Sequence, residues 1–191
     1  MADLGTPLPS FSLKEVRTGR LVECPGTMHG RPVLVIFLCR HCPFVVHVRE
    51  EIARVGRDYA GKVDMLAISS NDAANYPDDS PERLKAMADE LGLAFPVCHD
   101  ETQEVARQFT AACTPDFFLY DAAHKLAYRG QLDGSRPGNS VAVDGRDLRA
   151  ALDALLSGGQ PSATQYPSIG CNIKWKAGAE PEYFASALVK K

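Results

Sequence analysis

Apolar runs and amphipathic segments alternate along most of the chain. Strands are indicated where β-branched, aliphatic and aromatic residues follow one another almost without interruption, as in RPVLVIFL and VDMLAISS. Helices are indicated where apolar residues recur at steps of three and four. The pattern predicts strands at 31–38, 63–70, 94–98, 116–121 and 126–132, and helices at 43–59, 81–91, 102–112 and 144–157.

Strands that alternate with helices are typical of α/β proteins. The last two predicted strands are joined by the turn Ala122–His124 and form an antiparallel hairpin, so we expect a central mixed sheet flanked by helices. Gly158 and Gly159 end the last helix, and the composition changes after them. The chain therefore divides into a domain at 1–159 and a C-terminal extension at 160–191, which we expect to pack on the domain.

Composition and charge narrow the range of partners. The formal net charge of the 191 residues is −3, and no long run of Lys or Arg is present, so neither nucleic acid nor an anionic membrane is indicated as a partner. No apolar run reaches the roughly 18 residues of a membrane span. The N-terminus lacks the basic and apolar regions of a signal peptide. We expect a cytoplasmic protein.

One cysteine pair has the spacing of a working dithiol. Six cysteines occur, at positions 24, 39, 42, 98, 113 and 171, and only Cys39 and Cys42 are close in sequence. In a reducing compartment disulfides are usually transient and catalytic. Cys39 ends a predicted strand and Cys42 falls at the first turn of a helix, whose N-terminus stabilises an anion. We expect Cys39 to be the more exposed and more acidic thiol, with a protonated His41 favouring its thiolate.

Two other interpretations of the pair stay open. Free cysteines are often simply buried, so both thiols could serve packing alone. A zinc site would need two further ligands, normally a second close pair, and Cys98–His99 is adjacent instead of spaced. We therefore expect no metal.

Three motifs together resemble a known superfamily. FLCRHCPFV after a buried strand, CTPDFFLYD far downstream and the hairpin ending YRG are similar to the thioredoxin superfamily, and more narrowly to its redoxin branch, grouped with alkyl hydroperoxide reductase and thiol-specific antioxidant proteins. The resemblance covers nearly the whole chain. It implies a thioredoxin-like fold and a thiol–disulfide oxidoreductase with an antioxidant or redox-homeostasis role.

The resemblance also assigns roles. It implies that Cys39 is the attacking thiolate and Cys42 the resolving one, with His41 beside them, and that the Cys39–Cys42 disulfide is the redox centre with no other cofactor. Substrates would be disulfide-containing proteins or small thiols, with an unidentified reductase or thiol donor. It implies a cis Thr114–Pro115 bond beside the dithiol. The substrate-binding residues would be Arg40, Pro43, Thr114 and Pro115.

Two alternative functions remain. Peroxiredoxins carry a Pro and, three residues before the reactive cysteine, a Thr or Ser. If Cys39 is the reactive cysteine, the corresponding residues are Pro32 and Ile36. If Cys42 is the reactive cysteine, they are Val35 and Cys39. Neither register supplies the hydroxyl. A copper-binding thioredoxin-fold protein is the other alternative, although its cysteines are separated by three residues instead of two.

Cys113 and Cys171 are possible auxiliary thiols. Cys113 directly precedes Thr114–Pro115, and Cys171 lies in the extension within YPSIGCNIKW. We expect this stretch to pack against the domain, because its aromatic and aliphatic residues are worth burying, and to place Cys171 on the active-site side.

Overall fold

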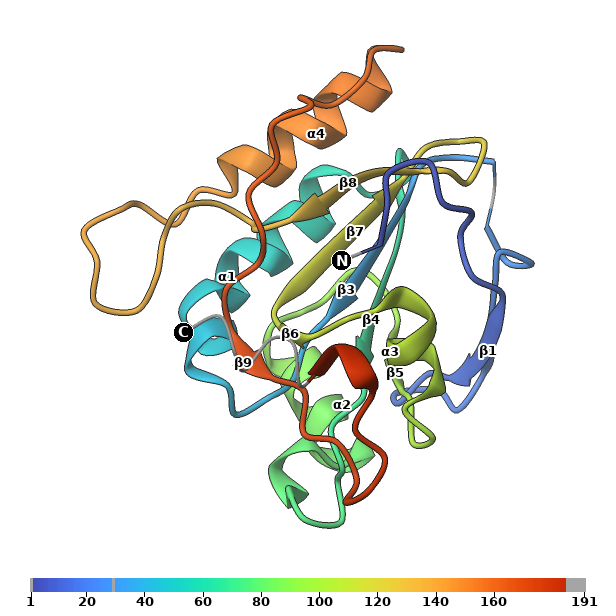
Figure 1. Cartoon of the computed structure of the whole chain (residues 1–191), viewed down its shortest axis with the longest axis vertical. Coiled ribbons are helices and arrows are strands. Elements are labelled where there is room, and N and C mark those ends of the chain that lie inside the picture. The colour runs from blue at the N-terminus through green and yellow to red at the C-terminus, as the bar shows by residue number, and fades with distance from the viewer. Residues whose placement is uncertain (1, 29, 185–191) are drawn as a thin grey trace.

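The computed structural model describes residues 2–28 and 30–184 and contains a central five-stranded sheet (Figure 1). Its strand order is β5-β4-β3-β7-β8. β3, β4 and β5 are parallel, whereas β7 is antiparallel to β3 and β8 is antiparallel to β7. The sheet is therefore mixed, as the sequence predicts. The strands are β3 (Val33–Phe37), β4 (Asp64–Ser69), β5 (Val97–His99), β7 (Asp116–Tyr120) and β8 (Leu126–Gly130).

Apolar side chains are buried on both faces of the sheet. Along β3, Leu34 and Ile36 join one apolar cluster, and Val33, Val35 and Phe37 join the other, because successive side chains of a strand point to opposite faces. The first cluster includes residues of α1 (Pro43–Asp58), α2 (Pro81–Glu90) and α4 (Arg146–Leu156), and the second includes residues of α3 (Glu104–Phe109). Burial on both faces explains the uninterrupted apolar runs.

A hairpin lies on the α3 side of the sheet. β1 (Phe11–Lys14) pairs with β2 (Leu21–Cys24) in antiparallel register. The turn contains Gly19 at φ 71, in the left-handed region that favours glycine. The Cys24–Pro25 bond that follows is cis.

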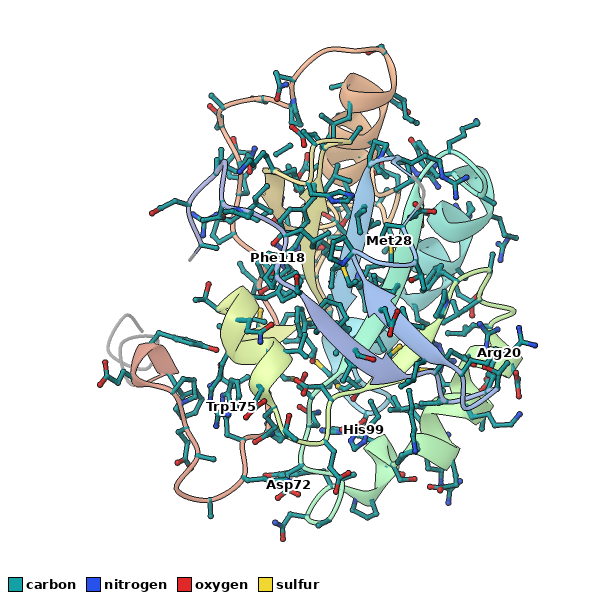
Figure 2. The ribbon with its side chains drawn as sticks, turned by 90° about the vertical axis from the view of Figure 1, so that its right-hand side faces the viewer. Arg20, Met28, Asp72, His99, Phe118 and Trp175 are labelled. Atoms are coloured by element: carbon teal, nitrogen blue, oxygen red, sulfur yellow. The ribbon has the colours of Figure 1, made fainter. Side chains whose placement is uncertain are left out.

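The C-terminal extension returns to the sheet after α4 (Figure 1). Its β9 (Cys171–Asn172) pairs antiparallel with β6 (Cys113–Thr114), which directly precedes β7. Trp175 is buried and lies beside α3 (Figure 2), where the Arg107 guanidinium stacks 5.3 Å from the indole ring. Residues 185–191 of the expected extension lie outside the described residues.

Several local features differ from the sequence prediction. The helix expected at 102–112 is confined to α3, because Gln103 and Thr110 at its ends have φ of 63 and 51, outside the helical region. The β6–β9 pair was not predicted, since two-residue strands carry no periodic signal. A short 3₁₀ helix, η1 (Pro77–Asp79), precedes α2.

Candidate active site around the cysteine pair

The first turn of α1 begins at Cys42 and not at Cys39. Pro43 is the first helical residue, and Cys42 is the N-cap with extended backbone angles of φ −63 and ψ 124. Proline suits this first position because it has no N–H to leave unpaired. Cys39 stands three residues earlier, just after β3. The backbone N–H of Cys42 donates a hydrogen bond to the Cys39 sulfur, so the start of α1 faces Cys39 as expected, and the Cys42 sulfur lies at the same positive end of the helix.

Both sulfurs are buried. The exposed fraction is 1% for Cys39 and 0% for Cys42, so the expectation of an exposed Cys39 is wrong. The physical reason lies in the C-terminal extension. β9 pairs with β6 beside the dithiol, and Cys171 contacts the Cys42 sulfur.

Cys42 is the more acidic thiol of the pair. The Cys39 thiol donates a hydrogen bond to the Cys42 sulfur, the Cys171 thiol and the backbone N–H groups of Val45 and Cys171 do likewise, and together they lower the pKa of Cys42 against the effect of burial. The pKa of Cys39 is raised by its hydrogen bond to Cys42, by burial and by the Asp79 carboxylate. The acidity order is thus opposite to the one expected from sequence.

Thr114 contacts both sulfurs. Its hydroxyl lies 3.2 Å from Cys39 Sγ, and its carbonyl oxygen lies 3.2 Å from Cys42 Sγ. When Cys42 is protonated, its thiol donates a hydrogen bond to this carbonyl, and that bond disfavours the Cys42 thiolate. The four hydrogen bonds donated to the Cys42 sulfur favour the thiolate and outweigh it. The Thr114–Pro115 peptide bond is cis, and both residues are buried.

A buried carboxylate anchors the loop between the two cysteines. Asp79, with no solvent exposure, accepts hydrogen bonds from the Arg40 backbone N–H and from the Asn71 side-chain amide, each at 2.7 Å. His41 Nδ1 lies 2.7 Å from Asp79 Oδ2, and its ring stacks on Tyr76 at 5.9 Å. Sequence reasoning missed Asp79, whose position in η1 has no spacing relation to the cysteines.

Three side chains at the contact between this loop and η1 could also hold a metal ion. One ligand atom from each of Cys39, His41 and Asp79 falls within 4.8 Å of the others. Thiolate and imidazole are ligands for zinc and copper. Asp79 already accepts two hydrogen bonds, so a metal would compete with them for its oxygens.

The remaining candidate residues lie at different depths. Pro43 is exposed, and Arg40 is partly exposed with its guanidinium 3.6 Å from the Asp78 carboxylate. Cys113 is buried with its thiol 3.8 Å from the Pro115 carbonyl oxygen, and burial raises its pKa well above the ordinary value. Cys171 is half-buried at the dithiol.

Two further cysteines lie away from the site. Cys24 and Cys98 belong to the apolar cluster on the α3 side of the sheet. Burial raises the pKa of each to about 12, as for thiols that serve packing.

The architecture is that of a thioredoxin-like α/β protein. A thiol:disulfide interchange protein of the thioredoxin family from Chlorobium tepidum superimposes with a TM-score of 0.63, at 20% identity over 82% of this chain and 99% of that one. This likeness is one of fold.

Sequence relatives are much closer. The AhpC/TSA family model matches residues 4–129, and the chain belongs to that family. An uncharacterized conserved protein from Geobacillus kaustophilus is 50% identical over 94% of this chain and 95% of that one, with a TM-score of 0.91. A hypothetical protein from Sinorhizobium meliloti 1021 is 46% identical over 93% of this chain and 97% of that one, also with a TM-score of 0.91.

No curated protein is found to match the chain. Among the helices of residues 2–28 and 30–184, none combines the length and the apolar character that crossing a bilayer requires. The cytoplasmic location stays a prediction.

Proposed function

We propose that the protein is a thiol–disulfide oxidoreductase in which Cys42 attacks the substrate and Cys39 resolves the intermediate. The observation that carries this proposal is the position of Cys42 at the N-terminus of α1, where the Cys39 and Cys171 thiols donate hydrogen bonds to its sulfur. A thiolate is the nucleophile of disulfide exchange, and the second thiol needed to release the product is already in contact.

The reaction balances as two exchanges. The Cys42 thiolate attacks one sulfur of a substrate disulfide, so that a Cys42–substrate disulfide forms and the other substrate sulfur leaves as a thiolate. Cys39 then loses its proton and attacks Cys42 Sγ, and the second substrate sulfur leaves. The substrate gains two electrons as a dithiol, and the protein is left with a Cys39–Cys42 disulfide.

The substrates in this proposal are disulfide-containing proteins or small disulfides, and a thiol donor or reductase returns the dithiol. No further cofactor is needed, because the dithiol itself supplies the two electrons. Thr114 and Pro115 line the buried side of the site, and Arg40 and Pro43 line the side toward solvent. A cytoplasmic role in redox homeostasis is part of the same proposal.

A redox titration of the full chain against glutathione tests the proposal. We expect a two-electron couple that disappears in Cys42→Ser and persists in Cys98→Ala, the control for a buried thiol outside the site. A protein disulfide should form a stable mixed disulfide at Cys42 when Cys39 and Cys171 are both Ser. A couple that survives Cys42→Ser would refute the proposal.

Peroxidase activity is a second candidate because of one observation. The Thr114 hydroxyl, 3.2 Å from Cys39 Sγ, supplies beside the dithiol the hydroxyl that neither sequence register provides. Replacing the protein disulfide with hydrogen peroxide in the same assay separates the two. Oxidation by peroxide that is faster than by disulfide and is lost in Thr114→Val would favour the peroxidase.

A further inference from the structure

The C-terminal extension is held against the active site along residues 166–175, which we call the strap. The Tyr166 carbonyl accepts from the Gln131 N–H at 3.0 Å, and the Ile173 N–H donates to the Ala112 carbonyl at 3.1 Å. At its far end, the Lys174 N–H donates to Asn71 Oδ1 at 2.8 Å. Asn71 in turn donates to Asp79.

The middle of the strap lies directly on the Thr114–Pro115 peptide. A Cβ atom built on Gly170 would stand 2.0 Å from the Thr114 carbonyl oxygen and 2.6 Å from its carbon, a distance that no side chain tolerates. Glycine is therefore required at position 170 for the approach. The next residue, Cys171, faces Thr114 in the β6–β9 register.

The strap occupies the backbone edge that a substrate chain would use. A chain that brings its own disulfide to Cys42 would pair with the edge of β6, as extended peptides pair with exposed sheet edges. β9 already makes this pairing, and it carries a cysteine at the position that faces the Cys42 sulfur. The strap thus has the form of a bound substrate.

The three thiols differ in access. Cys39 and Cys42 are 1% and 0% exposed, whereas Cys171 is half-buried, so that it borders both the Cys42 sulfur and the solvent. The other cysteines of the described residues, Cys24, Cys98 and Cys113, are buried. A disulfide that includes Cys171 is consequently more accessible to an external thiol than the Cys39–Cys42 disulfide.

We propose that Cys171 is a third redox thiol, which takes the disulfide over from Cys39 and passes it to an external low-molecular-weight thiol. This proposal rests on the dithiol function argued above. Cys171 loses its proton to solvent and attacks Cys42 Sγ, the Cys42–Cys171 bond forms, the Cys39–Cys42 bond breaks, and Cys39 leaves as a thiolate that is protonated. The number of disulfides is unchanged, so this step needs no oxidant.

Reduction then proceeds from outside. The external thiolate attacks Cys171 Sγ, Cys42 leaves as a thiolate, and a mixed disulfide forms at Cys171. A second external thiolate attacks the external sulfur of that mixed disulfide and releases Cys171. Two external thiols are oxidised to one disulfide, and the protein regains all three thiols.

The test follows glutathione reduction of the oxidised full-length protein, with acid quenching and mass-spectrometric mapping of disulfides. In the wild type we expect a Cys42–Cys171 disulfide beside Cys39–Cys42. Cys171→Ser keeps the size of the side chain and should still form Cys39–Cys42, but glutathione should reduce it about tenfold more slowly. Equal reduction rates, or no Cys42–Cys171 disulfide in the wild type, would overturn the relay.

Gly170→Ala tests whether the relay requires the strap to lie against Thr114. The clash with Thr114 should displace Cys171, abolish the Cys42–Cys171 disulfide and speed alkylation of Cys42. Gly134→Ala is the matched control, because a Cβ there meets a neighbour only at an ordinary 3.8 Å.

If Cys171→Ser exchanges normally, the relay fails and the dithiol function stands. If no disulfide at Cys42 forms in Cys171→Ser, both fail.

Discussion

His41 Nδ1 lies 2.7 Å from Oδ2 of Asp79, a carboxylate with no solvent exposure. The contact ties the loop between the two cysteines to η1, and it brings an ionisable ring close to Cys39. The Asp79 carboxylate raises the pKa of Cys39, so a proton on His41 offsets the charge that disfavours the Cys39 thiolate. His41 is therefore placed to influence the redox potential through Asp79.

His41→Phe should make the pair more reducing. Phenylalanine keeps a ring to stack on Tyr76 but carries no charge, so the Asp79 carboxylate is no longer offset and the negative charge of the reduced, hydrogen-bonded Cys39–Cys42 pair loses stabilisation. The potential should fall by about 30 mV for each 1.4 kcal/mol lost, measured by glutathione titration. Tyr76→Phe, which retains the stacked ring, is the control and should leave the potential unchanged. A potential unaffected by His41→Phe would mean that the histidine only positions the loop.

The acidity of Cys42 should depend on a donor at position 39. The Cys39 thiol makes the largest contribution to the lowered pKa of Cys42. Cys39→Ser retains a donor and should leave Cys42 ionised in mildly acidic solution, whereas Cys39→Ala removes the donor and should raise its pKa. Thiolate absorbance followed against pH measures both. Identical titrations in the two variants would contradict the donor role, and Cys42→Ser should remove the acidic transition.

The main sheet and its helices could be predicted from sequence because each has its own local signal. β3 and β4 carry apolar runs buried on both faces, and α2 begins at the Ser80 N-cap before Pro81. β6 and β9 could not be predicted. They have two residues each, and their pairing joins segments more than fifty residues apart.

The cysteine pair and its position at the start of a helix were predictable, but the burial of its sulfurs was not. Pro43 marks the first residue of the helix, and this signal correctly places Cys42 at its start. The burial of both thiols depends on the strap, and the environment of Cys39 depends on Asp79. Both are long-range contacts, so no spacing within the chain reveals them.

A buried ion cluster on α1 should be important for stability. Glu51, 1% exposed, lies 2.7 Å from the Arg149 guanidinium of α4 and 2.8 Å from that of Arg54. Glu51→Ala leaves Arg149 with the Asp58 carboxylate, 2.8 Å away, as its remaining partner and should lower the free energy of unfolding by about 1.5–3 kcal/mol, measured by urea denaturation. Glu50→Ala, on the exposed side of α1, should change it by less than about 0.5 kcal/mol. Equal effects of the two substitutions would show that the cluster contributes nothing.

Asp116 should make the protein less stable as the pH rises. It follows Pro115 and accepts a hydrogen bond from the Ala112 N–H, while the Ser168 hydroxyl of the strap donates to the neighbouring Gly130 carbonyl; burial raises the pKa of Asp116 to about 7. Between its unfolded pKa of about 3.9 and this value, the folded chain holds a proton that the unfolded chain has lost, so stability falls with pH in this window.

Asp116→Asn keeps the acceptor oxygen and removes the ionisation. Its free energy of unfolding should match the wild type near pH 4, exceed it increasingly up to pH 7 and then stay constant, with a final gain on the order of 4 kcal/mol. Urea denaturation across this range, with Glu50→Gln as the exposed control, measures the difference. A gain that is the same at every pH would show that Asp116 does not titrate on folding, and its effect would then come from packing against the strap.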